Sequence, residues 1–285
     1  RQSTARLVMV VDVPVELRSW VDDHYPELVR LYEDLHAHPE LSGNEVWTAD
    51  TLAGELERRG YSVSTGIGGH GVVGVLENGP GPVLLLRAEL DALPIEEKTG
   101  LPYASQVKVR APNGLNIPVS HACGHDLHMA VLTGSAAALV HFRSHWSGTL
   151  LCVGQPSEEA TSGARAMMHD RLYERFPRPH YALALHVGPG IPLGSIGFQE
   201  ELVSAGSQSL DLLIRGVGGH AAYPDNAKDP IVMAAQIILG LQTIRSRELS
   251  PLDFGVVTVG AIHGGVKHNA IPDEVLLRSL SPFRS

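Results

Sequence analysis

Cysteine is scarce in this chain: Cys123 and Cys152 are the only two in 285 residues, and no Asn-X-Ser/Thr acceptor for glycosylation occurs. Two cysteines cannot build the disulfide framework on which small secreted domains depend. The longest apolar stretch near the N-terminus, residues 7–11, is too short for the core of a signal peptide. We therefore expect a cytoplasmic protein.

Basic residues and long hydrophobic runs are also in short supply. The chain carries 22 Lys and Arg against 31 Asp and Glu, a formal net charge of −9. Because a surface that follows a phosphate backbone needs clustered basic side chains, this balance argues against a nucleic-acid partner. No apolar run approaches the roughly 20 residues that span a bilayer, so no membrane partner is expected. The length suits one large globular domain or two smaller ones.

Histidine, in contrast, is abundant. The 15 His equal in number all the Phe, Tyr and Trp residues together. Imidazole is the commonest metal ligand among side chains and an acid–base group near neutral pH. Scattered surface histidines would also explain the number, so the useful question is whether they cluster with Cys, Asp and Glu.

Hydrophobic periodicity predicts a larger α/β region followed by a smaller α+β region. Helices are expected over 14–35, with a kink or break at Pro26, over 42–59 behind a capping box of Ser42 and Glu45, over 126–141 and over 229–247. Strands are expected over 61–65, 72–76, 83–87, 149–154, 181–186, 209–214, 254–262 and 274–280. Alternating strands and helices indicate a sheet covered on both faces. We place the first domain at 1–201 and the second at 202–285.

One glycine-rich segment imitates a cofactor motif. Residues 66–71 fit the spacing G-x-G-x-x-G of dinucleotide-binding folds. That motif has to open a helix whose N-terminus receives the pyrophosphate, whereas a strand rich in Val and Gly follows here. A plain β-turn is the better interpretation. The sequence contains neither the G-x-S-x-G elbow of serine hydrolases nor the H-E-x-x-H helix of zincins.

The strongest local signal is HACGHDLH at 121–128. Cys123 and His125 lie two residues apart, so in an extended segment both project to the same side and can reach one ion. Thiolate and imidazole are natural ligands for zinc-like divalent ions. Asp126 could accept the spare imidazole N–H. The alternative is a buried small cysteine with incidental histidine neighbours.

Further polar clusters follow other predicted strands. Glu158 and Glu159 come directly after the strand over 149–154, where a solvated helix start is the alternative. His186 ends another strand, and Glu89 and Asp91 end a third. Ligand sites assemble at the carboxyl ends of strands in α/β sheets. Together these residues suit a dinuclear site, in which paired ions hold an attacking water and polarise a carbonyl.

These motifs resemble the M20 family of metallo-amidohydrolases and peptidases, in its aminoacylase-like branch, which includes hippurate hydrolases and indole-acetyl-amino-acid hydrolases. The resemblance is carried by LHAHPELSGNE, RAELDALPIEE, HACGHDLH, GQPSEEA, ALHVGP, RGVGGHAAYPDNAKDP and GGVKHNAIPDE. It implies a metallopeptidase-type α/β catalytic domain, with a mixed sheet covered by helices, and a smaller α+β lid and dimerisation domain. The implied metal ligands are Cys123, His125, Glu159 and His186, which hold two divalent ions, either Zn, Mn, Co or Ni.

The resemblance also assigns the remaining roles. Glu158 is the general base, and Asp91 is an acidic residue behind the ligands. His220 on the lid helps to bind the scissile carbonyl, usually in the partner subunit's site of a homodimer, and Asn269 binds substrate. The implied reaction is metal-dependent hydrolysis of the amide bond of N-acyl amino acids.

Two departures from the family pattern keep alternatives open. Glu89 stands where this branch usually has Asp. Family members continue past the position of Ser285 to a further His ligand, and Pro282 would interrupt the last lid strand. The lid is therefore expected to be incomplete. The alternatives are a truncated, catalytically inactive family member and a small-peptide carboxypeptidase.

Overall fold

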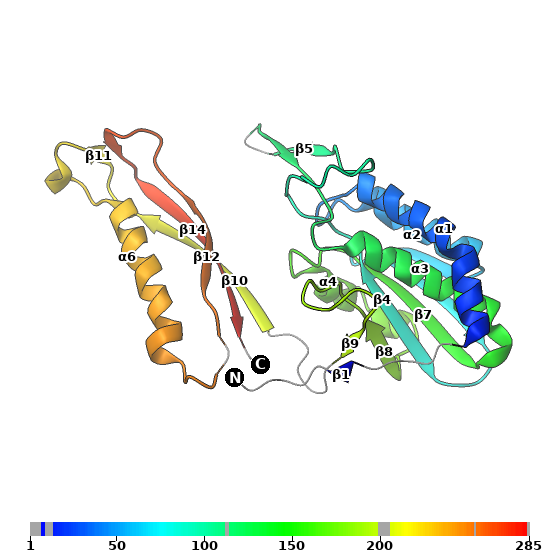
Figure 1. Ribbon diagram of the computed structural model, residues 1–285. Coiled ribbons are helices and arrows are strands. Elements are labelled where there is room, and N and C mark those ends of the chain that lie inside the picture. Colours follow the sequence, from blue (N-terminus) through cyan, green and yellow to red (C-terminus); the bar gives the residue numbers. More distant parts are fainter. Residues whose placement is uncertain (1–6, 9–13, 112–113, 199–205, 254, 284–285) are drawn as a thin grey trace. The chain divides into compact units, whose positions relative to one another are not determined.

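A computed structural model describes the chain except for residues 1–6, 9–13, 112–113, 199–205, 254 and 284–285 (Figure 1). The chain divides into two units, one of Val10–Gly194 and one of Ser195–Ser285 together with Arg1–Met9. The domain boundary predicted between residues 201 and 202 lies outside the described residues. No described helix is long and apolar enough to cross a membrane.

The larger unit is built on a mixed sheet of five strands in the order β2-β3-β7-β4-β8 (Figure 1). Their bounds are β2 Ser62–Ile67, β3 Gly71–Asn78, β4 Val83–Glu89, β7 Gly148–Gln155 and β8 Tyr181–Ala184. Strand β3 is antiparallel to β2 and β7, whereas β4 is parallel to both β7 and β8. The carboxyl ends of β7, β4 and β8 therefore meet at one edge of the sheet. The glycine-rich segment over 66–71 is the turn between β2 and β3, as predicted.

Helices cover both faces of this sheet. They are α1 Val15–Ala37, α2 Val46–Arg58, α3 His125–His141, α4 Gly163–His169 and α5 Leu172–Arg175. Because side chains alternate along β7, Leu150 and Cys152 join the core beneath α2 and α3, while Leu151 and Val153 pack on the side of α4 and α5. The predicted α/β fold with a mixed, doubly covered sheet is confirmed.

Two details of the predicted helices are wrong. Helix α1 is one helix of 23 residues through Pro26, so the alternative of two helices split at that proline is wrong. The capping box at α2 does not form, because the Ser42 hydroxyl donates to Asp91 and Glu45 makes no capping hydrogen bond. The carboxylate of Glu40 instead accepts the N–H groups of Trp47 and Thr48, at 3.2 and 2.8 Å.

The smaller unit holds a three-stranded antiparallel sheet in the order β10-β14-β12. Its strands are β10 Gly206–Arg215, β12 Thr258–His263 and β14 Glu274–Phe283. Helix α6, Pro230–Thr243, packs Ala234 against Val275 and Leu277 of β14. It begins as predicted, with the Asp229 carboxylate accepting from the N–H of Ile231. A π-helical turn, Ile244–Glu248, follows it.

Strand β14 continues through Pro282, so the predicted interruption is wrong. Pro282 pairs with Ser207 of β10, while the pairing of β14 with β12 ends at Leu280. Pairing with Gly206–Arg215 of β10 keeps the backbone of β14 extended through the proline. The remaining elements are short: β1 Leu7–Val8, β5 Lys108–Arg110, β6 Asn116–Pro118, β9 Gly197–Phe198, β11 Gly219–His220, β13 Ala270–Ile271 and two 3-10 turns, Arg143–His145 and Pro224–Asn226.

Candidate metal centre

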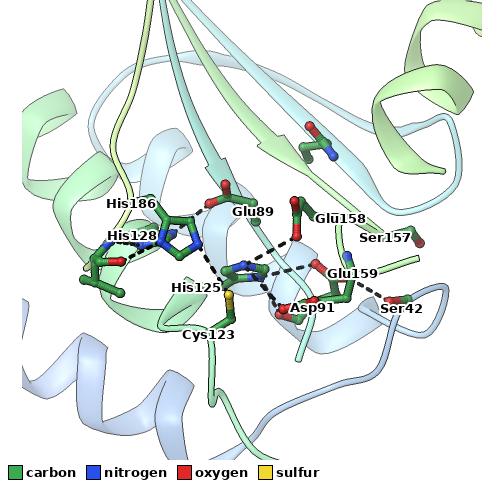
Figure 2. A network of polar contacts seen from close by, with 12 residues as sticks. Ser42, Glu89, Asp91, Cys123, His125, His128, Ser157, Glu158, Glu159 and His186 are labelled. Carbon is green, nitrogen blue, oxygen red and sulfur yellow. Dashed lines mark hydrogen bonds and ion pairs between the residues drawn. The ribbon is translucent and has the colours of Figure 1, made fainter. Parts of the chain in front are cut away.

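Polar side chains gather at the carboxyl edge of the parallel strands, where β4, β7 and β8 end and α3 begins (Figure 2). Glu89 is the last residue of β4, and Asp91 follows it. Glu158 and Glu159 follow β7, and His186 follows β8. Cys123 and His125 precede and open α3. Elements distant in the sequence thus deliver seven acidic, thiol and imidazole groups to one place.

Cys123, His125 and His186 point their ligand atoms toward one another (Figure 2). The Nδ1 atom of His125 donates to the carbonyl of Asp91 at 2.8 Å, and its buried Nε2 has no hydrogen-bond partner in the part of the chain that the structure describes. His186 similarly uses Nδ1 to donate to the carbonyl of Val187. Its Nε2 lies 3.3 Å from the Cys123 sulfur. One sulfur and two imidazole nitrogens therefore face a common point.

The two carboxylates after β7 complete this cluster. Glu158 Oε2 and Glu159 Oε1 lie 3.8 and 3.9 Å from Nε2 of His125. Glu159 Oε1 is buried with no hydrogen-bond partner among the described residues. The side chain of Glu158 is the more exposed of the two, at 39% against 21%. Adjacent glutamates therefore differ in their surroundings.

Electrostatics of the cluster favour a cation. Burial, together with the nearby carboxylates of Glu159 and Glu158, raises the pKa of the Cys123 thiol to about 12. Burial and the charges of Glu158 and Asp91 likewise raise the pKa of Glu159. A divalent ion stabilises the anionic form of each ligand. The orphaned nitrogen of His125 and oxygen of Glu159, with a soft sulfur beside them, fit a zinc-like ion.

Asp91 supports this cluster from behind. Its Oδ2 accepts from the Ser42 hydroxyl at 2.6 Å and from the Glu159 N–H at 2.9 Å. Although burial opposes it, hydrogen bonds from His125, Ser42 and the backbone lower the pKa of Asp91. Asp91 therefore fixes the orientation of the His125 ring from the Nδ1 side, with Nε2 directed at the cluster.

The predicted role of Asp126 is wrong. Its Oδ2 pairs with Nδ1 of His36 at 2.6 Å and not with a ligand histidine. The other nitrogen of His36 contacts Glu97 at 3.1 Å. Nδ1 of His125 donates to the backbone carbonyl of Asp91 instead. The Asp126 carboxylate pairs with His36 of α1.

His128 was not singled out by the sequence analysis. It donates from Nδ1 to Glu89 at 2.8 Å and accepts the Val187 N–H on Nε2 at 3.0 Å. Glu89 is also paired with Arg87; despite burial, these partners lower its pKa to about 2. The i, i+3 spacing of His125 and His128 on a helix was the available signal, because it places both on one face. His128 therefore ties the end of β4 to the segment that carries His186.

His220 and Asn269 lie together in the smaller unit and not in the cluster of Figure 2. His220 pairs with Ala270 across the β11-β13 ladder, and the Ala221 N–H donates to the carbonyl of Asn269 at 3.2 Å. Nδ1 of His220 accepts the Ala222 N–H. Its Nε2 therefore carries the ring proton and is available as a donor.

Comparison with known proteins gives this geometry a context. A sequence model of peptidase family M20/M25/M40 matches residues 85–269. N-acetyl-L-cysteine deacetylase of Bacillus subtilis is 38% identical over 252 residues, or 88% of this chain and 58% of the relative. Hippurate hydrolase of Campylobacter jejuni is 38% identical over 251 residues, or 87% of this chain and 62% of the relative.

A solved structure agrees in fold. The crystal structure of Bacillus subtilis YXEP, described as a dinuclear metal binding peptidase from the M20 family, aligns with a TM-score of 0.66 and 30% identity. The alignment covers 93% of this chain and 65% of that one. This chain thus spans less than two thirds of each of these three proteins. Because the family model matches residues 85–269, which is more than half of the chain, the chain belongs to peptidase family M20/M25/M40.

Proposed function

We propose that this protein hydrolyses the amide bond of N-acyl amino acids with the help of bound divalent metal. The observation that carries the proposal is the cluster of Cys123, His125 and His186 beside Glu158 and Glu159, in which His125 Nε2 and Glu159 Oε1 are buried without a partner. Polar atoms are costly to bury without a partner, and a bound cation would satisfy both of these.

Cys123, His125, Glu159 and His186 would hold the metal. When bound, divalent ions supply Lewis-acid polarisation of a carbonyl and a lower pKa for water. The thiolate among the ligands favours zinc, whereas manganese, cobalt and nickel are alternatives. The relation to a dinuclear metal binding peptidase supports two ions.

The protein's own side chains then handle protons and orientation. Glu158 accepts a proton from the attacking water and returns it to the leaving amine, since it is the more accessible of the two adjacent carboxylates. Asp91 fixes the ring of His125 through the contacts described above. His220 donates from Nε2 to the oxygen that becomes negative, and the neighbouring Asn269 contacts the substrate.

The substrate class follows from the relatives. A deacetylase of N-acetyl-L-cysteine and a hippurate hydrolase are both named for N-acyl amino acids. We propose the same class here, and keep two proposals from the sequence: a homodimer formed through the smaller unit and a cytoplasmic location.

The test is a comparison of two substrate sets after saturation with Zn²⁺, Mn²⁺, Co²⁺ or Ni²⁺. We expect N-acetyl and N-benzoyl amino acids to be hydrolysed and unblocked dipeptides to be left intact. The reverse preference would establish a small-peptide carboxypeptidase. Metal bound equally by the parent and by Cys123→Ala would refute the ligand assignment.

A further inference from the structure

Glu45 is a buried carboxylate without a basic partner. Its exposed fraction is 0%, and no ion pair involves it among the described residues. It is the residue before α2, yet its side chain makes no hydrogen bond to that helix, whose first N–H groups are capped by Glu40. An ionised group in such a place is costly to bury unless its hydrogen bonds are made elsewhere. Glu45 is therefore not explained by the helix that it precedes.

The partner of Glu45 is the turn that carries the two glutamates of the metal centre. Glu45 Oε1 accepts the backbone N–H of Ser157 at 2.7 Å and lies 3.3 Å from its hydroxyl. Ser157 has φ of 48°, in the left-handed region that a residue with a side chain seldom adopts. Among the described residues, the side chain of Glu45 has no hydrogen-bond partner outside this strained turn.

The turn that carries Glu158 and Glu159 is held at a second point by Asp91, to which Ser42 also bonds. The Glu159 N–H donates to Asp91 Oδ2, and the Ser42 hydroxyl donates to that oxygen as well. Ser42 and Glu45 lie three residues apart, between α1 and α2 (Figure 1). The segment over 42–45 therefore contacts the turn directly at Ser157 and, through Asp91, at the N–H of the proposed ligand Glu159.

We propose that Glu45 is a positioning residue of the metal centre: its carboxylate holds the Ser157 backbone in the left-handed conformation that directs Glu158 and Glu159 toward His125. This inference rests on the proposed metal-dependent function. Residues behind metal ligands orient them, and their loss lowers metal affinity or activity by about 10–100-fold.

Co²⁺ binding to the whole chain tests the proposal, because visible absorption of bound cobalt reports coordination geometry. We compare the parent with Glu45→Ala and with Glu45→Asp, which keeps the charge but is one methylene too short to keep both contacts. The matched control is Glu55→Ala. Glu55 is also a buried carboxylate of α2, but its partners are Arg58 and Arg59.

We expect both Glu45 variants to bind Co²⁺ about 10–100-fold more weakly, with an altered spectrum. We expect Glu55→Ala to lower the melting temperature and leave both cobalt readouts unchanged. A folded Glu45→Ala or Glu45→Asp with parental affinity and spectrum would overturn the positioning role. If Glu45→Ala does not fold, Glu45→Asp decides. A parent chain that binds no Co²⁺ would refute the proposed function instead, so the two failures differ.

Discussion

Replacing His128 with alanine would show how strongly the buried Glu89–His128 pair supports both the fold and the metal centre. The side chains of Glu89 and His128 are 3% and 1% exposed. The His128 ring donates from Nδ1 to the Glu89 carboxylate and accepts the Val187 N–H on Nε2. Val187 follows His186, so the ring holds the backbone next to a proposed ligand.

The expected loss of stability follows from the two partners that alanine would leave unpaired. A buried donor or acceptor that loses its partner costs about 1–3 kcal/mol, and more when the group left unpaired is charged, as the Glu89 carboxylate is. Burial alone would raise the pKa of Glu89, but His128 and Arg87 lower it from 4.5 to about 2. That change corresponds to roughly 3 kcal/mol of stabilised carboxylate. We therefore expect His128→Ala to lower the free energy of unfolding by about 3–5 kcal/mol, a large part of a typical 5–15 kcal/mol.

Urea unfolding of the metal-free chain and Co²⁺ titration are the two assays. We expect His128→Ala to bind cobalt about 10–100-fold more weakly because the His186 segment loses its anchor. His141→Ala is the control: it lies at the other end of α3, is exposed, and should change stability by less than about 0.5 kcal/mol. A loss below about 1 kcal/mol in His128→Ala, with parental cobalt affinity, would refute this reasoning.

Two further predictions concern other buried or partly buried acids and bases. Glu158→Gln should retain metal and lose about 10²–10⁴-fold in turnover, as expected for a general base. Glu159→Gln should lose the metal itself, because Glu159 is a proposed ligand. Equal metal loss in both variants would contradict the assignment. Burial of His36 disfavours its charged form, but hydrogen bonds to Glu97 and Asp126 outweigh burial and raise its pKa above 6.5. The stability that this pair contributes is therefore complete below about pH 6.5 and lost as pH rises through the folded-state pKa. The difference in urea stability between parent and His36→Gln should shrink at alkaline pH, and parallel pH curves would contradict it.

Local patterns in the sequence were sufficient for most elements. The Asp229-Pro230 pair predicted the start of α6 because an Asp cap and a proline in the first turn act within a few residues. Alternating or continuous apolar runs predicted the strands of the larger sheet for the same reason. The predictions failed where a distant partner competed with a local one. The Ser42 hydroxyl was predicted to cap the start of α2, but it donates to Asp91, 49 residues away.

Position in the sheet decided the outcome at Pro282. Read along the chain, a proline in an apolar strand predicts an interruption. In the structure Pro282 lies opposite Ser207 in an unbroken antiparallel ladder between β14 and β10, which keeps the strand extended through the proline. Strand order is a property of the assembled sheet and cannot be read from one strand.

The sequence by itself determined the types of the proposed ligands and the elements that bear them, because Cys-X-His spacing and residues at strand ends are local properties. Only the tertiary structure decided which nitrogen of His125 faces the cluster, since the other nitrogen donates to the carbonyl of Asp91, which follows a distant strand. It also decided that Glu45 meets Ser157, 112 residues away. Such long-range hydrogen bonds form because a buried polar group is separated from bulk water and needs a partner from another part of the folded chain.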